Sequence, residues 1–108
     1  MFYIYEKKLS LAIIDNMSRK VRKHYRFTGR VQGVGFRFTA YHIATQLGIT
    51  GWVYNEWDGS VIMEAQGDSS LLDKLISLID QGTFIHIEGI DEEEIPLRAH
   101  ESSFEMKN

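Results

Sequence analysis

Residues 29–37 read GRVQGVGFR and separate two segments of the chain that have different apolar periodicities. The residues before them, HYRFT at 24–28, alternate polar and aromatic side chains, as a half-buried strand does. After them, apolar side chains recur at helical spacing and form a single stripe made of Phe36, Ala40, Ile43, Ala44 and Leu47. The stretch therefore predicts a strand, a glycine-rich loop and an amphipathic helix that ends at Gly48.

The composition of this loop predicts a binding site for an anion, most simply a phosphate. Its three glycines let backbone N–H groups turn inward at positions that a side chain would block. A row of such amides at the start of a helix attracts an anion, and Arg37, one residue into the predicted helix, can bind the same group through its guanidinium. What is done to the phosphate does not follow from the loop alone.

A hairpin and a second helix are predicted to follow. Residues 49–55 and 61–66 have the composition of strands, and Asp58-Gly59 between them is a strong turn signal. Ser69 or Ser70 is the expected N-cap of the next helix. The buried stripe of that helix is expected to consist of Leu72, Leu75, Ile76 and Ile79.

The last part of the chain completes a sheet. Residues 84–88 alternate again and predict a fourth strand, the acidic run at 91–94 predicts a solvated loop, and 103–106 are a candidate for a short fifth strand. The predicted fold is α+β: a ferredoxin-like βαββαβ sandwich, with a four-stranded antiparallel sheet covered on one face by two helices. This fold hosts many functions and does not by itself decide the chemistry.

The composition excludes several classes of protein and site. The chain has 108 residues, which predicts one domain, and no cysteine, which excludes disulfides, thiolate metal sites and a cysteine nucleophile. Its longest early apolar stretch, residues 9–14, is far shorter than the roughly 20 residues that a membrane span needs. We therefore expect a cytoplasmic protein that has no membrane partner.

Charge is distributed unevenly along the chain. Residues 1–37 carry nine Lys/Arg against two Asp/Glu, whereas residues 38–108 carry three Lys/Arg against thirteen Asp/Glu. The basic first third would steer a small anion towards the loop, or its charges are simply solvated. The acidic remainder argues against binding to a nucleic-acid duplex.

General motifs for nucleotide and metal binding do not fit. The loop lacks the Lys-Ser/Thr ending of a nucleotide P-loop, and Gly33-Val34-Gly35 lacks the third glycine of a dinucleotide fingerprint. The histidines show no metal-ligand spacing. We expect neither a metal nor a cofactor.

Asn55, in the segment GWVYN at 51–55, is the second candidate site residue. Its amide both donates and accepts hydrogen bonds, so it can hold a water molecule, although it cannot act as a general base. It would lie near the loop if the strand that ends at Asn55 ran beside the strand that enters the loop. The alternative is that Asn55 serves only the turn before Asp58-Gly59.

Four strings together resemble the acylphosphatase family, which are small ferredoxin-like enzymes that hydrolyse the carboxyl–phosphate bond of acyl phosphates. They are GRVQGVGFR at 29–37, GWVYN at 51–55, DGSV at 58–61 and AQG at 65–67. The resemblance runs from about Tyr25 to Met106. It implies an acylphosphatase-like domain over residues 21–108. Residues 1–20 are an extension, and their composition leaves open whether it adds an edge strand, packs on the surface or forms a flexible arm.

The resemblance also implies roles for individual residues. The loop is expected to bind the substrate phosphate through backbone amides of Gly29, Arg30, Val31, Gln32, Gly33, Val34 and Gly35. Arg37 is expected to hold the phosphate, and Asn55 to position the attacking water. An acyl phosphate already has a good carboxylate leaving group, so positioning and charge stabilisation suffice without a metal, a cofactor or a covalent nucleophile. The chain departs from the family at Tyr54, where a basic or polar residue is common, and in the extension.

Two alternatives differ from this hypothesis. A non-catalytic phosphate- or RNA-binding ferredoxin-like module would use Tyr25, Phe27, Trp52 and Tyr54 as stacking platforms. Against it, the aromatic octapeptide of RNA-recognition motifs is missing, and Tyr25 and Phe27 have the parity expected to face the helices. The other alternative is a domain of the same family that acts on carbamoyl phosphate with a separate partner protein. We expect a monomer that binds a small acyl phosphate and no nucleic acid.

Overall fold

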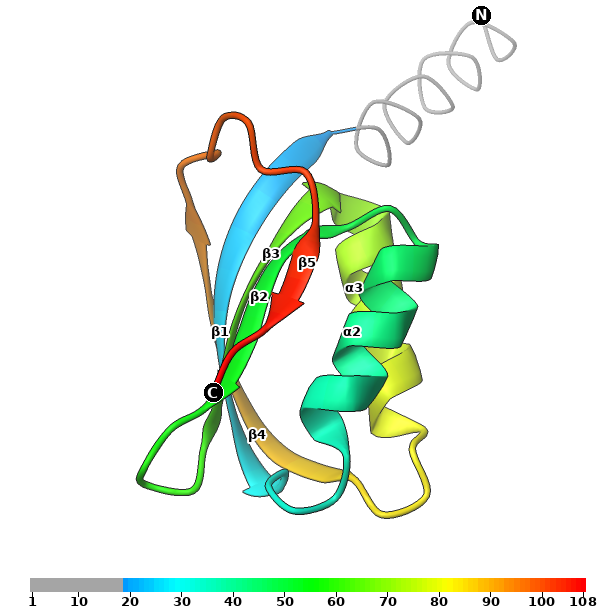
Figure 1. Ribbon diagram of the computed structural model, residues 1–108, viewed down its shortest axis with the longest axis vertical. Coiled ribbons are helices and arrows are strands. Elements are labelled where there is room, and N and C mark those ends of the chain that lie inside the picture. Colours follow the sequence, from blue (N-terminus) through cyan, green and yellow to red (C-terminus); the bar gives the residue numbers. More distant parts are fainter. Residues whose placement is uncertain (1–18) are drawn as a thin grey trace, which may run out of the picture.

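The computed structural model describes residues 19–108, which form one sheet with two helices packed on the same face (Figure 1). The extension predicted for residues 1–20 lies outside the described residues, apart from Arg19 and Lys20. The elements, in chain order, are β1 (Lys20–Arg30), α2 (Phe36–Gln46), β2 (Thr50–Asn55), β3 (Val61–Asp68), α3 (Ser69–Asp80), β4 (His86–Ile95) and β5 (Phe104–Met106).

The strand order in the sheet is β4-β1-β3-β2-β5. β1 pairs antiparallel with both β3 and β4, and β2 pairs antiparallel with β3. The short β5 pairs with β2 in the parallel sense, with Val53 opposite Met106, so the complete sheet is mixed. The ferredoxin-like α+β fold predicted from the sequence is confirmed, and the candidate fifth strand is present.

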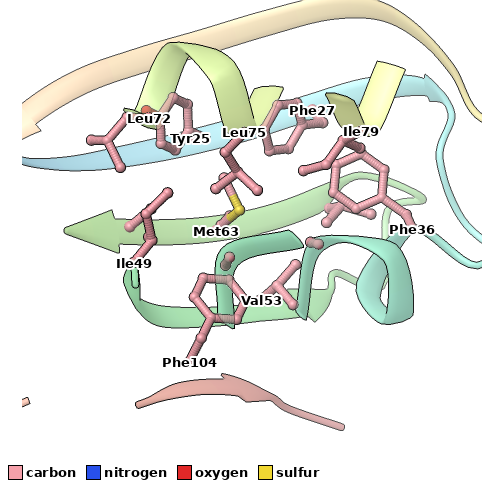
Figure 2. Close-up of a cluster of buried hydrophobic side chains, with 14 of the residues drawn as sticks. Tyr25, Phe27, Phe36, Ile49, Val53, Met63, Leu72, Leu75, Ile79 and Phe104 are labelled. Carbon is pink, nitrogen blue, oxygen red and sulfur yellow. The ribbon is translucent and has the colours of Figure 1, made fainter. Parts of the chain in front are cut away.

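The core lies between the sheet and the two helices (Figure 2). Alternation along β1 places Tyr25 and Phe27 in it, fully buried and stacked with ring centroids 5.7 Å apart. The apolar stripes predicted for the helices are confirmed, since their central members are buried: Phe36, Ala40 and Ala44 from α2, and Leu72, Leu75 and Ile79 from α3. Because Tyr25 and Phe27 are buried, they cannot serve as platforms for nucleic-acid bases.

Within residues 19–108, no helix lies on the other face of the sheet, and this face is organised around a buried arginine (Figure 1). The Arg22 side chain is only 2% exposed. Its Nη1 and Nη2 donate to the two carboxylate oxygens of Glu101 at 2.8 and 3.2 Å, and its Nε donates to Glu64 at 3.0 Å. Beside it, Gln66 accepts a hydrogen bond from the Arg98 backbone N–H and donates one to the Arg98 carbonyl. These contacts fasten the connection between β4 and β5 to the sheet.

The start of α3 differs from the prediction by one residue. The N-cap is Asp68, which has an extended backbone, rather than Ser69 or Ser70. Pairing between β1 and β3 continues as far as Asp68, which lies opposite Lys20, and the Ser69 N–H still donates to the Arg19 carbonyl. The strand therefore runs directly into the helix.

The acidic run at 91–94 is not a solvated loop, as predicted, but part of β4. β4 is an edge strand beside the basic β1, and the charges of the two strands pair across the sheet. Arg19 approaches Glu94 at 2.9 Å and Lys23 approaches Glu92 at 3.4 Å. The predicted strand at 84–88 accordingly begins two residues later, at His86, and extends to Ile95.

Candidate active site

The loop between β1 and α2 contains two glycines that hold left-handed backbone conformations. Gly33 and Gly35 have φ of +71° and +81°, which other residues adopt only with strain. Gly35 is the N-cap of α2 and supplies no side-chain cap, and no acidic residue lies in the first turn. The first backbone N–H groups of the helix are therefore not occupied by a side-chain cap, which is compatible with the predicted anion site.

A cavity of about 370 Å³ opens beside this loop. Its lining comes from three parts of the chain that are distant in sequence. The loop and the first turn of α2 supply one side, with Val31, Gly33, Gly35, Phe36, Arg37 and Phe38. The ends of β2 and β5 and the last residue supply the other side, with Asn55, Met106 and Asn108. The structure therefore brings Arg37 and Asn55 to one cavity.

Arg37 is held by the segment that follows β5. Its Nη1 donates to the Lys107 carbonyl at 2.7 Å and to the Asn108 Oδ1 at 3.2 Å. That segment is in turn held against β2, because the Lys107 N–H donates to the Val53 carbonyl at 2.8 Å. Both bonds of Arg37 use the same nitrogen, so within residues 19–108 its Nη2 and Nε remain available to bind two oxygens of a ligand.

The side-chain oxygen of Asn55, at the end of β2, has an unusual environment. This Oδ1 is buried and accepts no hydrogen bond from any residue that the structure describes. Leaving such an acceptor unpaired costs about 1–3 kcal/mol, and Asn55 is one of the residues that line the cavity, so its amide lies where a ligand or a water molecule can reach it. The Tyr25 hydroxyl is also buried and unpaired, but it lies in the core, where desolvation raises its pKa, and not in the cavity.

Gln32 explains how the loop comes close to Asn55. The two strands are not neighbours, because β3 lies between β1 and β2. The loop instead reaches across the end of β3. The Gln32 Nε2 donates to the carbonyls of Glu56 and Ser60, at 2.6 and 2.8 Å, and so ties the loop to the turn between β2 and β3.

That turn is itself well braced, which fixes the end of β2. The Glu56 N–H donates to the Ser60 carbonyl at 2.9 Å, and Asp58 accepts hydrogen bonds from the Ser60 N–H and hydroxyl. Arg26 adds an ion pair to Asp58 at 2.9 Å. The hydrogen bonds from Ser60, followed by those from Arg26, lower the pKa of Asp58 to about 2. The turn therefore keeps its charged brace throughout the neutral range.

Several residues of the predicted site lie elsewhere. Gly29 and Arg30 belong to β1, paired with Ile87 and His86 of β4, and Arg30 lines a different cavity. Val34 packs against the core. Tyr54 is outside the lining too: its hydroxyl donates to Glu56 at 2.6 Å, which raises the pKa of the phenol.

Two apolar residues of the lining were missed from the sequence. Phe38 and Met106 line the cavity with Arg37 and are largely exposed. A signal for Phe38 was present, because it is an aromatic residue in the predicted helix that lies outside the apolar stripe. Met106 carried no such signal, since it is placed here only by the parallel pairing of β5 with β2.

Comparison with known proteins identifies the family. The family model described as acylphosphatase matches residues 23–106. The chain belongs to the acylphosphatase family. It is therefore an enzyme of that family, whose reaction is acyl phosphate hydrolysis.

Individual relatives agree with this assignment over most of their length. An acylphosphatase of Caldanaerobacter subterraneus subsp. tengcongensis is 38% identical over 84 residues, which cover 77% of this chain and 93% of the relative. The crystal structure of acylphosphatase from Bacillus subtilis superposes with a TM-score of 0.75 at 28% identity, covering 82% of this chain and 99% of that one. An acylphosphatase structure from Coxiella burnetii gives a TM-score of 0.74 at 29% identity, covering 82% and 93% of the two chains.

Metal-ligand clusters and membrane-spanning helices are both absent from the described residues. Across residues 19–108, no group of three or more His, Asp or Glu side chains is placed to hold a metal ion. None of the helices in that range is long and apolar enough to cross a membrane.

Proposed function

We propose that the cavity beside the 31–35 loop is the catalytic site and that it hydrolyses acyl phosphates by in-line attack of water on phosphorus. The observation that carries this proposal is that Asn55, whose Oδ1 has no hydrogen-bond partner among the described residues, lines the same cavity as Arg37 and the glycine loop. An anion site alone would hold a phosphate. An added side-chain amide that can hold a water molecule gives the site a means of cleaving it.

The phosphate is held by charge and by backbone amides. Arg37 offers Nη2 and Nε in a planar fork that matches two phosphate oxygens, while its Nη1 is anchored by the Lys107 carbonyl. The amides around Gly33 and Gly35 and at the start of α2 stabilise the remaining oxygens. These groups are fixed before the substrate arrives, so they stabilise the charge that shifts on to the phosphoryl oxygens during transfer.

Asn55 holds the nucleophile. The side-chain amide hydrogen-bonds to a water molecule and directs an oxygen lone pair of that water towards phosphorus. The new P–O bond forms as the bond between phosphorus and the acyl oxygen breaks, and the carboxylate leaves with that electron pair. No His, Asp or Glu side chain of the described residues lines the cavity, so the proton of the water passes to a phosphate oxygen of the substrate itself.

The proposal is tested by phosphate release from benzoyl phosphate. Arg37→Ala and Arg37→Lys are expected to lower kcat/KM by on the order of 100-fold or more, because lysine lacks the planar fork. The matched control is Arg19→Ala, which removes the same charge at the opposite end of β1 and is expected to change kcat/KM by less than about twofold. Equal rates for Arg37→Ala and Arg19→Ala would remove Arg37 from the mechanism.

A further inference from the structure

The cavity that contains Arg37 and Asn55 also has an apolar wall, which the binding of a phosphate does not require. Phe38 of α2 and Met106 of β5 line it with 61% and 46% of their surface exposed. Large apolar side chains exposed beside a polar site mark a surface that is covered when a ligand binds.

Neither side chain is needed for the core. Phe38 lies off the buried stripe of α2, and its ring lies against that of His42, an exposed neighbour in the same helix, at 4.2 Å between centroids. Met106 lies opposite the buried Val53 in the sheet register, but it is not itself a member of the buried core. Their position beside Arg37 therefore reflects the site rather than the fold.

The charges that line the cavity restrict the chemical class of the acyl group further. Among the residues that the structure describes, Arg37 is the one charged side chain in the cavity lining, and the phosphate neutralises that charge. A second anionic group on the acyl part, as in a dicarboxylic acyl phosphate, would find no cation in the lining. An amino group would find no carboxylate there.

We propose that Phe38 and Met106 form a subsite for the acyl group, so that the enzyme prefers acyl phosphates whose acyl part is apolar and about the size of an aromatic ring. The inference rests on the proposed function of the site. An aromatic face and a polarisable thioether are the side chains that suit such a group, because the ring packs against both without a fixed hydrogen-bond geometry. This preference concerns only the acyl part and leaves the chemistry at phosphorus unchanged.

The test compares kcat/KM for benzoyl phosphate, acetyl phosphate and succinyl phosphate. In the wild type we expect the benzoyl compound to exceed both others. Phe38→Ala and Met106→Ala are each expected to lower kcat/KM for benzoyl phosphate by about 5- to 10-fold while leaving acetyl phosphate within about twofold. The effect of each variant is the change, relative to the wild type, in the ratio of kcat/KM for benzoyl phosphate to kcat/KM for acetyl phosphate. The intrinsic reactivities of the two substrates cancel in this comparison.

Phe84→Ala is the matched control, since Phe84 is 68% exposed but lines a different cavity. It is expected to leave the benzoyl-to-acetyl ratio unchanged. An unchanged ratio in the folded Phe38→Ala/Met106→Ala double variant would overturn the subsite, as would a wild type that hydrolyses succinyl phosphate best. If the wild type hydrolysed none of the three, the proposed function itself would fail, which is a different result from a loss of selectivity.

Discussion

Replacing Gln32 with alanine tests whether the loop must be fastened to the β2–β3 turn for catalysis. The substitution removes two hydrogen bonds, to the carbonyls of Glu56 and Ser60. Neither carbonyl is left unpaired, because Glu56 still accepts from the Gly59 N–H and Ser60 still accepts from the Glu56 N–H. The loss is therefore that of two ordinary hydrogen bonds, about 1–3 kcal/mol, and each kcal/mol lowers Tm by roughly 4–8 °C in a domain of this size.

The activity should fall by more than this loss of stability explains. A loop that is free to move from Asn55 no longer presents its amides and the water acceptor together, so we expect kcat/KM for benzoyl phosphate to fall about 10-fold or more. Gln66→Ala is the matched control, since Gln66 also bonds a distant backbone, at Arg98, but on the helix-free face of the sheet. It should lose at least as much stability in urea unfolding and keep its kcat/KM.

Two results would refute this reasoning. If folded Gln32→Ala lost stability as expected but kept the wild-type kcat/KM, fastening the loop would have no part in catalysis. If Gln32→Ala and Gln66→Ala lost activity equally, the effect would be one of general stability.

Three further predictions concern the buried ion cluster and the reaction. Arg22→Met leaves the carboxylates of Glu64 and Glu101 without their shared cation and should cost about 3–5 kcal/mol in urea unfolding; a loss below about 1 kcal/mol would contradict the importance of the cluster. Burial alone would raise the pKa of Glu64 and of Glu101, but hydrogen bonds from His24 and Arg22 to the first, and from Arg22 and Thr50 to the second, outweigh it and lower both below 4.5. The stability that these carboxylates contribute is therefore fully present above about pH 5 and lost as the pH falls below 4.5. The free energy of unfolding of the wild type should accordingly fall more between pH 5 and 3 than that of Arg22→Met. Equal losses would exclude the cluster as the cause. EDTA should leave phosphate release from benzoyl phosphate unchanged, whereas a loss restored by Mg²⁺ would contradict a reaction that needs no metal.

Local patterns predicted much of this fold. The apolar stripes of both helices and the strand alternation around Tyr25 and Phe27 follow from short-range periodicity, and the structure places them as predicted. The prediction of a solvated loop at 91–94 was wrong because these residues form a strand by pairing with β1, more than 60 residues earlier in the chain. The isolated run has the composition of a loop, but in the sheet it faces Lys23 and Arg26.

The candidate site also combines features that follow from local sequence with features that depend on long-range contacts. The glycine loop and Arg37 are adjacent in sequence, so their association needs only local geometry. Asn55 comes close to them through a long-range contact that no sequence pattern predicted: the Gln32 side chain hydrogen-bonds across the end of β3 to the turn that follows Asn55. Arg22 shows the converse error, since it counted among the basic residues of the first third of the chain, described as steering or solvated, yet it is buried against two acids.

The most direct test of the account is the division of labour between Asn55 and Arg37, measured as kcat for benzoyl phosphate and as Ki for inorganic phosphate in the same preparations. Asn55→Ala is predicted to lower kcat by on the order of 100-fold or more and to leave Ki within about twofold, because it loses the water and keeps the phosphate site. Arg37→Ala is predicted to raise Ki substantially. A folded Asn55→Ala protein that hydrolyses benzoyl phosphate at close to the wild-type rate would contradict the central claim.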